Sequence, residues 1–101
     1  MTVNVFVRFF PSAGQAERVE QILRTMVPAT RGEPGCQRYD LFQAASASGE
    51  RIFCLIEKYA DSAAVQAHRE SAHYRAYRAD IVPLLAQPIE VTLLEAIDAR
   101  G

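Results

Sequence analysis

Apolar residues alternate with other residues at the start of the chain and predict a β-strand over residues 2–10. One face of this strand would consist of valines and Phe9. The other face would mix aromatic rings with polar groups, which is unlike a plain core. Pro11 should end the strand because proline has no N–H for a sheet ladder. The second face comprises Asn4, Phe6, Arg8 and Phe10.

The next segment of the chain predicts a helix, because its apolar residues fall on one helical face. These residues are Ala16, Val19, Ile22, Leu23 and Met26. Ser12 and Gln15 have the spacing of a capping box, so we expect the helix to open at Ser12. Pro28 predicts its end. Glycine and proline then indicate a loop over residues 30–35.

Two strand-like segments, residues 36–43 and 51–59, flank the turn-prone residues 44–49 and predict a β-hairpin. Asp61 is a good cap for a second helical region. We expect this region to break near Ser71, which can cap the piece that follows. Pro83 should kink the end of that piece, and residues 89–94 predict a last strand.

The order β-α-β-β-α-β predicts a ferredoxin-like α+β fold, with one antiparallel sheet and both helices on one face. We expect residues 1–101 to form a single domain. The uncovered sheet face would carry an apolar patch larger than monomers usually expose. Pairing two subunits face to face would cover the patch and enclose a pocket, so a homodimer is expected. The residues assigned to this patch are Phe6, Phe10, Tyr39, Leu41, Phe53 and Leu55.

Composition narrows the possible classes of protein. Half of the residues are apolar, 23% are charged and the net charge is −1, which favours an ordinary globular chain without attraction to nucleic acid or an anionic membrane. No apolar run approaches the ~18–20 residues of a membrane span, and no signal peptide is evident. Cys36 and Cys54 would not lie opposite each other in the hairpin, so we expect two free thiols and a cytoplasmic protein.

The middle of the chain resembles the antibiotic biosynthesis monooxygenase family, which includes small quinol monooxygenases. The matching segments are EPGC (residues 33–36) with Tyr39, FCLIEKY (53–59), Asp61 with Ala64, and HRESAHY (68–74). The resemblance implies a dimeric α/β barrel and an aromatic or polyketide-like substrate held between helices and sheet.

The resemblance also implies oxygenation of phenols, anthrones or quinols by molecular oxygen without metal, flavin or haem, so no cofactor is expected. A haem-degrading branch of the family relies on a tryptophan and a haem-ligating histidine. This chain has no tryptophan, and the position of that histidine falls at Arg78. Haem degradation is therefore disfavoured.

His68, His73 and Glu57 are the candidate catalytic residues. A histidine can remove a phenolic proton, since its pKa lies near neutrality. On an unbroken helix, residues 68 and 73 would diverge by about 140°, so they converge only if the helix breaks near Ser71. The structural alternatives are that His68 hydrogen-bonds Glu57 and ties helix to strand, and that Glu57 takes part in a salt bridge or hydrogen bond rather than acting as a base.

Six residues are candidates for contact with a substrate. Asn4 can bind a carbonyl and Arg8 a developing oxyanion, although both can instead meet solvent or a partner subunit. The aromatic candidates are Phe6, Tyr39, Phe53 and Tyr74, of which Tyr74 shares a helical spacing with Tyr77 that is common in cores. Two histidines without a CxxC or HExxH pattern predict no dedicated metal site.

Three functions remain open. The first is a cofactor-independent monooxygenase acting on a quinol, anthrone or similar aromatic molecule. The second is an isomerase or lyase acting on a small oxygenated metabolite through the same histidines and Glu57. The third is a non-catalytic dimeric module that binds a small molecule. Oxygen consumption separates the first two, and a complete lack of turnover would mark the third.

Overall fold

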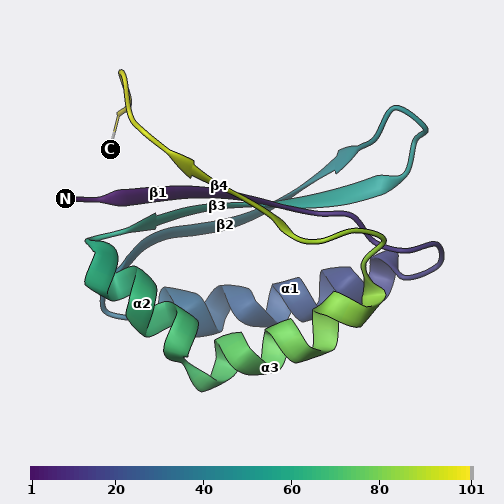
Figure 1. The fold of residues 1–101 in the computed structure, drawn as a ribbon, viewed down its shortest axis with the longest axis horizontal. Helices are drawn as coiled ribbons and strands as arrows, with labels where there is room; N and C mark the ends of the chain where they lie inside the picture. The colour runs from purple at the N-terminus through teal and green to yellow at the C-terminus, as the bar shows by residue number, and fades with distance from the viewer. Residues whose placement is uncertain (101) are drawn as a thin grey trace.

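The computed structural model describes residues 1–100 and has the predicted ferredoxin-like architecture (Figure 1). A four-stranded antiparallel sheet in the order β2-β3-β1-β4 is covered on one face by the helices. The elements are β1 (Val3–Phe9), α1 (Ala16–Arg31), β2 (Cys36–Ala45), β3 (Arg51–Tyr59), α2 (Ser62–Glu70), α3 (Ala72–Ile81), the 3₁₀ turn η1 (Val82–Leu84) and β4 (Glu90–Leu94).

Strand register decides which residues face the helices. Val7 of β1 lies opposite Leu55 of β3, and Leu55 lies opposite Leu41 of β2. Residues directly opposite each other share a sheet face, so odd-numbered residues of all three strands point towards the helices. The core therefore includes Val5, Val7, Phe9, Tyr39, Phe53, Leu55 and Tyr59, each no more than 5% exposed.

The predicted apolar patch on the open face is wrong in four of its six members, because Tyr39, Leu41, Phe53 and Leu55 face the helices. Phe6 and Phe10 do belong to the open face. Their neighbours there are even-numbered residues, since Phe6 pairs with Ile56. Arg8 lies between the two rings, with its guanidinium carbon 5.9 Å and 5.6 Å from their centroids. Further members of the open face are Phe42, Ile52, Cys54 and Leu94.

Helix α1 begins and ends later than the sequence pattern predicts. Gly14 has a φ of +79° and forms a turn, so the helix opens only at Ala16, and Gln15 provides no side-chain cap. The predicted capping box is therefore wrong. Pro28 lies inside the helix, which continues to Arg31. Proline has no backbone N–H, so one hydrogen bond of the helix is missing at Pro28. The helix tolerates this loss because Pro28 lies exposed in its last turn.

The predicted break at Ser71 is confirmed. Ser71 has extended backbone angles (φ −69°, ψ 152°) between α2 and α3. Its Oγ accepts a hydrogen bond from the backbone N–H of Tyr74 at 3.2 Å and donates one to the carbonyl of His68 at 2.6 Å. Asp61 caps α2 as predicted, by accepting from the N–H of Ala64 at 2.8 Å.

The remaining features agree with the sequence pattern in outline. The β2–β3 hairpin turns over residues 46–50, and both cysteines are free. After β4 the chain leaves the sheet and rises away from it (Figure 1). Within residues 1–100, no helix combines the length and apolar character that crossing a membrane requires.

Candidate functional site

Glu33 is the centre of a cluster that joins three separate elements. Its Oε2 lies 2.8 Å from Nδ1 of His68 and 2.6 Å from Nε2 of His73. A carboxylate can accept hydrogen bonds but has no proton to donate, so each of these ring nitrogens carries its hydrogen. We call these three residues the histidine–glutamate cluster.

The local backbone explains how this cluster forms. The bend at Ser71 turns α3 relative to α2, so two histidines five positions apart reach one carboxylate. The loop that carries Glu33 is pressed against α2. A Cβ added to Gly35 would lie 2.3 Å from the Cβ of Ala64, so only glycine allows this approach. The carbonyl of Gly35 also accepts a hydrogen bond from the N–H of Ala60 at 2.8 Å.

His68 is buried among aromatic rings. It is 4% exposed, and its ring centroid lies 4.9 Å from that of Tyr74, 5.4 Å from that of Tyr59 and 5.9 Å from that of Tyr39. Burial lowers the pKa of His68 below its ordinary value of 6.5, and the hydrogen bond with Glu33 only partly opposes this effect. Near neutral pH the imidazole is therefore uncharged, with the hydrogen on Nδ1 and a lone pair on Nε2.

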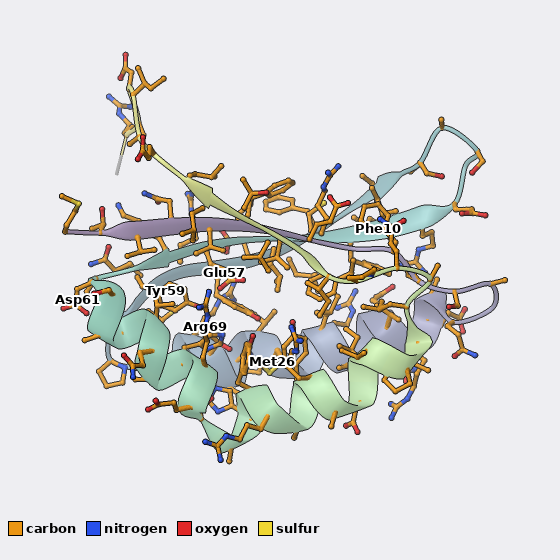
Figure 2. All side chains as sticks on the ribbon, in the orientation of Figure 1. Phe10, Met26, Glu57, Tyr59, Asp61 and Arg69 are labelled. Atoms are coloured by element: carbon orange, nitrogen blue, oxygen red, sulfur yellow. The ribbon has the colours of Figure 1, made fainter. Side chains whose placement is uncertain are left out.

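Glu57 is the second buried titratable group. It is 7% exposed, and burial raises its pKa from 4.5 to about 7. The hydroxyl of Tyr59 donates to its Oε1 at 2.6 Å, which partly offsets the rise. Figure 2 shows Glu57 and Tyr59 on the helix side of the sheet, with Arg69 extending towards them from α2. His68 hydrogen-bonds Glu33, so its proposed partnership with Glu57 is wrong.

His68 and Glu57 line one narrow cavity between the sheet and helices α2 and α3. Its volume is about 30 Å³, which is room for about one water molecule. Tyr39, Tyr59, Tyr74 and Tyr77 contribute to its wall. Burial is the main cause of the raised pKa of Tyr39, Tyr59 and Tyr77. The exposed residues of its lining are Arg69, Arg78 and Val91.

A larger groove of about 480 Å³ lies elsewhere, between α1 and the β2–β3 hairpin. Its lining includes Arg24, Arg31 and Arg51, but neither histidine. Each of these arginines has an acidic partner: Glu20 pairs with Arg24 and Arg51, and Asp40 pairs with Arg31. The groove is therefore larger and lined by ion-paired side chains, and the carboxylate in its lining, Glu20, is held by Arg24 and Arg51.

The residues that the sequence predicts for a site lie in different parts of the structure. His68, Glu57, Tyr39 and Tyr74 surround the narrow cavity. His73 contacts Glu33 but lies outside the cavity lining, and Phe53 is a buried core residue that borders the larger groove. Asn4, Phe6 and Arg8 lie on the opposite face of the sheet, where Arg8 pairs with Glu90 at 2.5 Å. The sheet separates these three residues from both histidines.

Two residues of the site carried no predicted role. Glu33 lies 35 positions before His68, and no periodicity connects them. The available signal was its place in the EPGC segment, immediately before a strand. Tyr59 could have been found from its spacing, since residues 57 and 59 share one face of a strand.

The profile of the antibiotic biosynthesis monooxygenase family matches residues 2–80. The chain belongs to this family. Rv0793 of Mycobacterium tuberculosis, a proposed monooxygenase, is 38% identical over 96 residues, which cover 95% of this chain and 92% of that protein. The structure of Rv0793 has a TM-score of 0.89 to this one, at 37% identity and with both chains fully covered.

Two further relatives are similar over most of their length. YcnE of Bacillus subtilis, also a proposed monooxygenase, is 34% identical over 82 residues, or 78% of this chain and 84% of its own. The crystal structure of PA3566 from Pseudomonas aeruginosa has a TM-score of 0.85 at 29% identity, and the match covers 96% of this chain and 95% of that one. This chain therefore shares its fold with Rv0793 and PA3566 over at least 96% of its length.

Proposed function

We propose that this protein is a monooxygenase that oxidises an electron-rich aromatic molecule, such as a quinol or an anthrone, with molecular oxygen. His68 acts as the general base, and Glu33 positions it. The observation that carries the proposal is the 2.8 Å contact between Glu33 and Nδ1 of His68, because it leaves Nε2 as the proton acceptor of a neutral, buried imidazole.

The chemistry needs only a base and a substrate that can reduce oxygen. His68 takes a proton from the substrate, and the resulting anion transfers an electron to oxygen. Recombination forms a C–O bond and a peroxide, and the peroxide takes up the proton. For an anthrone, loss of water then converts the CH₂ group into a ketone, so that one oxygen atom enters the product and the other leaves as water. A site closed to solvent favours this sequence because it protects the anion and the peroxide.

Substrate binding requires the narrow cavity to widen. An aromatic ring system needs far more room than the 30 Å³ present between the sheet and the helices. The lining residues on the solvent side, Arg69 and Arg78, are exposed and free to move outwards. Tyr74 is half-buried on α3 and is the aromatic wall residue most easily displaced. We expect the ligand to enter between these side chains.

Oxygen uptake by chelator-treated protein, measured with a panel of quinols and anthrones, tests this function. The decisive variant is His68→Asn, because the asparagine amide can still donate to Glu33 but offers no basic nitrogen. We expect its kcat to fall by about 10²–10⁴-fold, the usual contribution of a general base. Glu33→Gln should also lower kcat, through loss of the fixed imidazole tautomer, whereas Glu70→Gln on the exposed side of α2 should not.

Three other outcomes of these experiments would contradict the proposal. If His68→Asn takes up oxygen at the wild-type rate, His68 is not the base and the proposal fails. If a ligand is converted without oxygen uptake, the isomerase or lyase reading replaces it. If a ligand binds wild-type protein and is never converted, the chain is a binding module.

We also propose that a second copy of the chain covers the open sheet face. Phe42 is 55% exposed and Leu94 is 45% exposed on this face, beside the half-buried Phe6 and Phe10. An apolar surface of this kind is costly in water and favours burial against an identical surface across a two-fold axis. Asn4 and Arg8 would then contact the partner subunit.

A further inference from the structure

The histidine–glutamate cluster brings together three atoms that bind metals well. Glu33, His68 and His73 each offer one ligand atom, and these three atoms lie within 4.8 Å of one another. The Oε2 atom of Glu33 contacts Nδ1 of His68 and Nε2 of His73. Two imidazoles and one carboxylate make up the protein ligand set of zinc sites that keep a fourth position open. Two histidines alone are too few for a dedicated site, and Glu33 supplies the missing third ligand.

We propose that this cluster binds one divalent transition-metal ion, such as zinc, through Glu33, His68 and His73. Imidazole nitrogens favour zinc and its neighbours over calcium and magnesium, which prefer sites made only of oxygen ligands. His68 is buried and fixes one side of the site. The side chain of His73 is 32% exposed and that of Glu33 is 16% exposed, so an ion and its water can enter from the solvent side.

The cluster must open slightly to take the ion. A tetrahedral ion with bonds of about 2.0–2.1 Å separates its ligands by about 3.3 Å, whereas Oε2 now lies 2.8 Å and 2.6 Å from the two nitrogens. The carboxylate would have to withdraw by about 0.5 Å from the ring of His68 and by about 0.7 Å from that of His73. The Glu33 side chain has several rotatable bonds and is held at this end by two histidine contacts, so this adjustment is small.

Metal binding would change the tautomer of both histidines. Nδ1 of His68 and Nε2 of His73 must each give up their hydrogen to bind the ion, and the hydrogen of a neutral ring then resides on the other nitrogen. Nε2 of His68 would therefore become a donor. If His68 is the base of the proposed function, zinc and proton abstraction exclude each other at this residue.

Titration of chelator-treated, tag-free protein with zinc tests the site without any substrate. Calorimetry at pH 7.5 should give one ion per chain. His73→Ala and Glu33→Gln should each weaken binding by at least about 10–100-fold, the loss found even for outer-sphere partners of metal sites. Glu70→Gln removes an exposed carboxylate of α2 outside the cluster and should bind zinc as the wild type does. Thermal denaturation without metal confirms that each variant is folded.

Two spectroscopic measurements on the wild-type chain are independent of any variant. Cobalt should give the visible absorption bands of a tetrahedral ion. Long-range ¹H–¹⁵N spectra should show the hydrogen of His68 moving from Nδ1 to Nε2 as zinc is added. Binding that is unaffected by His73→Ala and Glu33→Gln, or an unchanged His68 tautomer at saturating zinc, would overturn the proposal. Neither result bears on oxygen uptake by the metal-free protein, so the two proposals can fail separately.

Discussion

Replacing Glu57 with glutamine should remove a stability penalty that exists only when this carboxyl group is ionised. Burial raises the pKa of Glu57 from 4.5 to about 7, so the folded state binds the proton more tightly than the unfolded state. The contribution of this group to stability is therefore fully present below pH 4.5 and is lost as the pH rises through 7. At about 1.4 kcal/mol per pKa unit, the complete loss amounts to about 3 kcal/mol.

The difference between two pH values isolates this effect. Applied to the same two pKa values, the linkage relation gives a penalty of about 1 kcal/mol at pH 5 and about 3 kcal/mol at pH 8. Glutamine has a similar shape, can accept the Tyr59 hydrogen bond and does not ionise. Glu57→Gln should therefore gain about 2–3 kcal/mol relative to wild type between pH 5 and pH 8. Any constant cost of burying the amide cancels in this difference.

Urea unfolding at pH 5 and pH 8, at one fixed protein concentration, measures the free energy of unfolding of both proteins directly. Tyr59→Phe removes the donor that lowers the pKa of Glu57, so its stability should fall more steeply with pH than that of the wild type. Glu17→Gln, an exposed residue on α1, is the matched control and should leave the pH dependence unchanged. The reasoning is refuted if Glu57→Gln and wild type lose the same stability between pH 5 and pH 8.

Three further predictions concern packing, capping and assembly. Gly35→Ala should lower the free energy of unfolding by about 1–3 kcal/mol, measured by thermal denaturation, because the new Cβ meets Ala64. Adding Ala64→Gly should restore most of this stability, and an unchanged stability of Gly35→Ala would contradict the close packing. Ser71→Ala should cost about 1 kcal/mol of unfolding free energy and Ser71→Asp should cost less, since aspartate also caps helices; equal losses would exclude capping as the cause. Because we propose that the open sheet face pairs two chains, Phe42→Asp should give a monomer in analytical ultracentrifugation where the wild type gives a dimer. Val82→Asp, on η1 and 48% exposed against 55% for Phe42, should not change the assembly; a dimeric Phe42→Asp protein would show that this face is not the interface.

The order of the elements could be predicted because each has a strong local signal. Alternation over β1 and β3 and the turn-prone residues between β2 and β3 are properties of neighbouring residues. The start of α1 was wrong for the same reason: Ser12 and Gln15 have the right spacing, but Gly14 between them adopts a positive φ that no helix contains. Local spacing cannot reveal that conformation.

The faces of the sheet and the centre of the site depend on long-range pairing. Alternation divides Phe53 and Ile52 between two faces but does not say which face meets the helices. That choice follows from the register with Val7 and Phe9 of β1. Glu33 was missed because its partners lie 35 and 40 positions away, across the whole hairpin. The convergence of the two histidines follows from the predicted break at Ser71, whereas no periodicity connects them to Glu33.

The β2–β3 hairpin places the site and the turn of residues 46–50 at opposite ends of the molecule (Figure 1). Cys36 pairs with Tyr59 beside the loop that carries Glu33, and Ala45 pairs with Arg51 at the far end. Ten residues of strand at about 3.3 Å each separate the two ends by roughly 30 Å. The exposed turn is therefore a suitable place to insert a fluorescent or affinity module, or to open the chain in a circular permutant, while the loop and helices that hold the histidines stay intact.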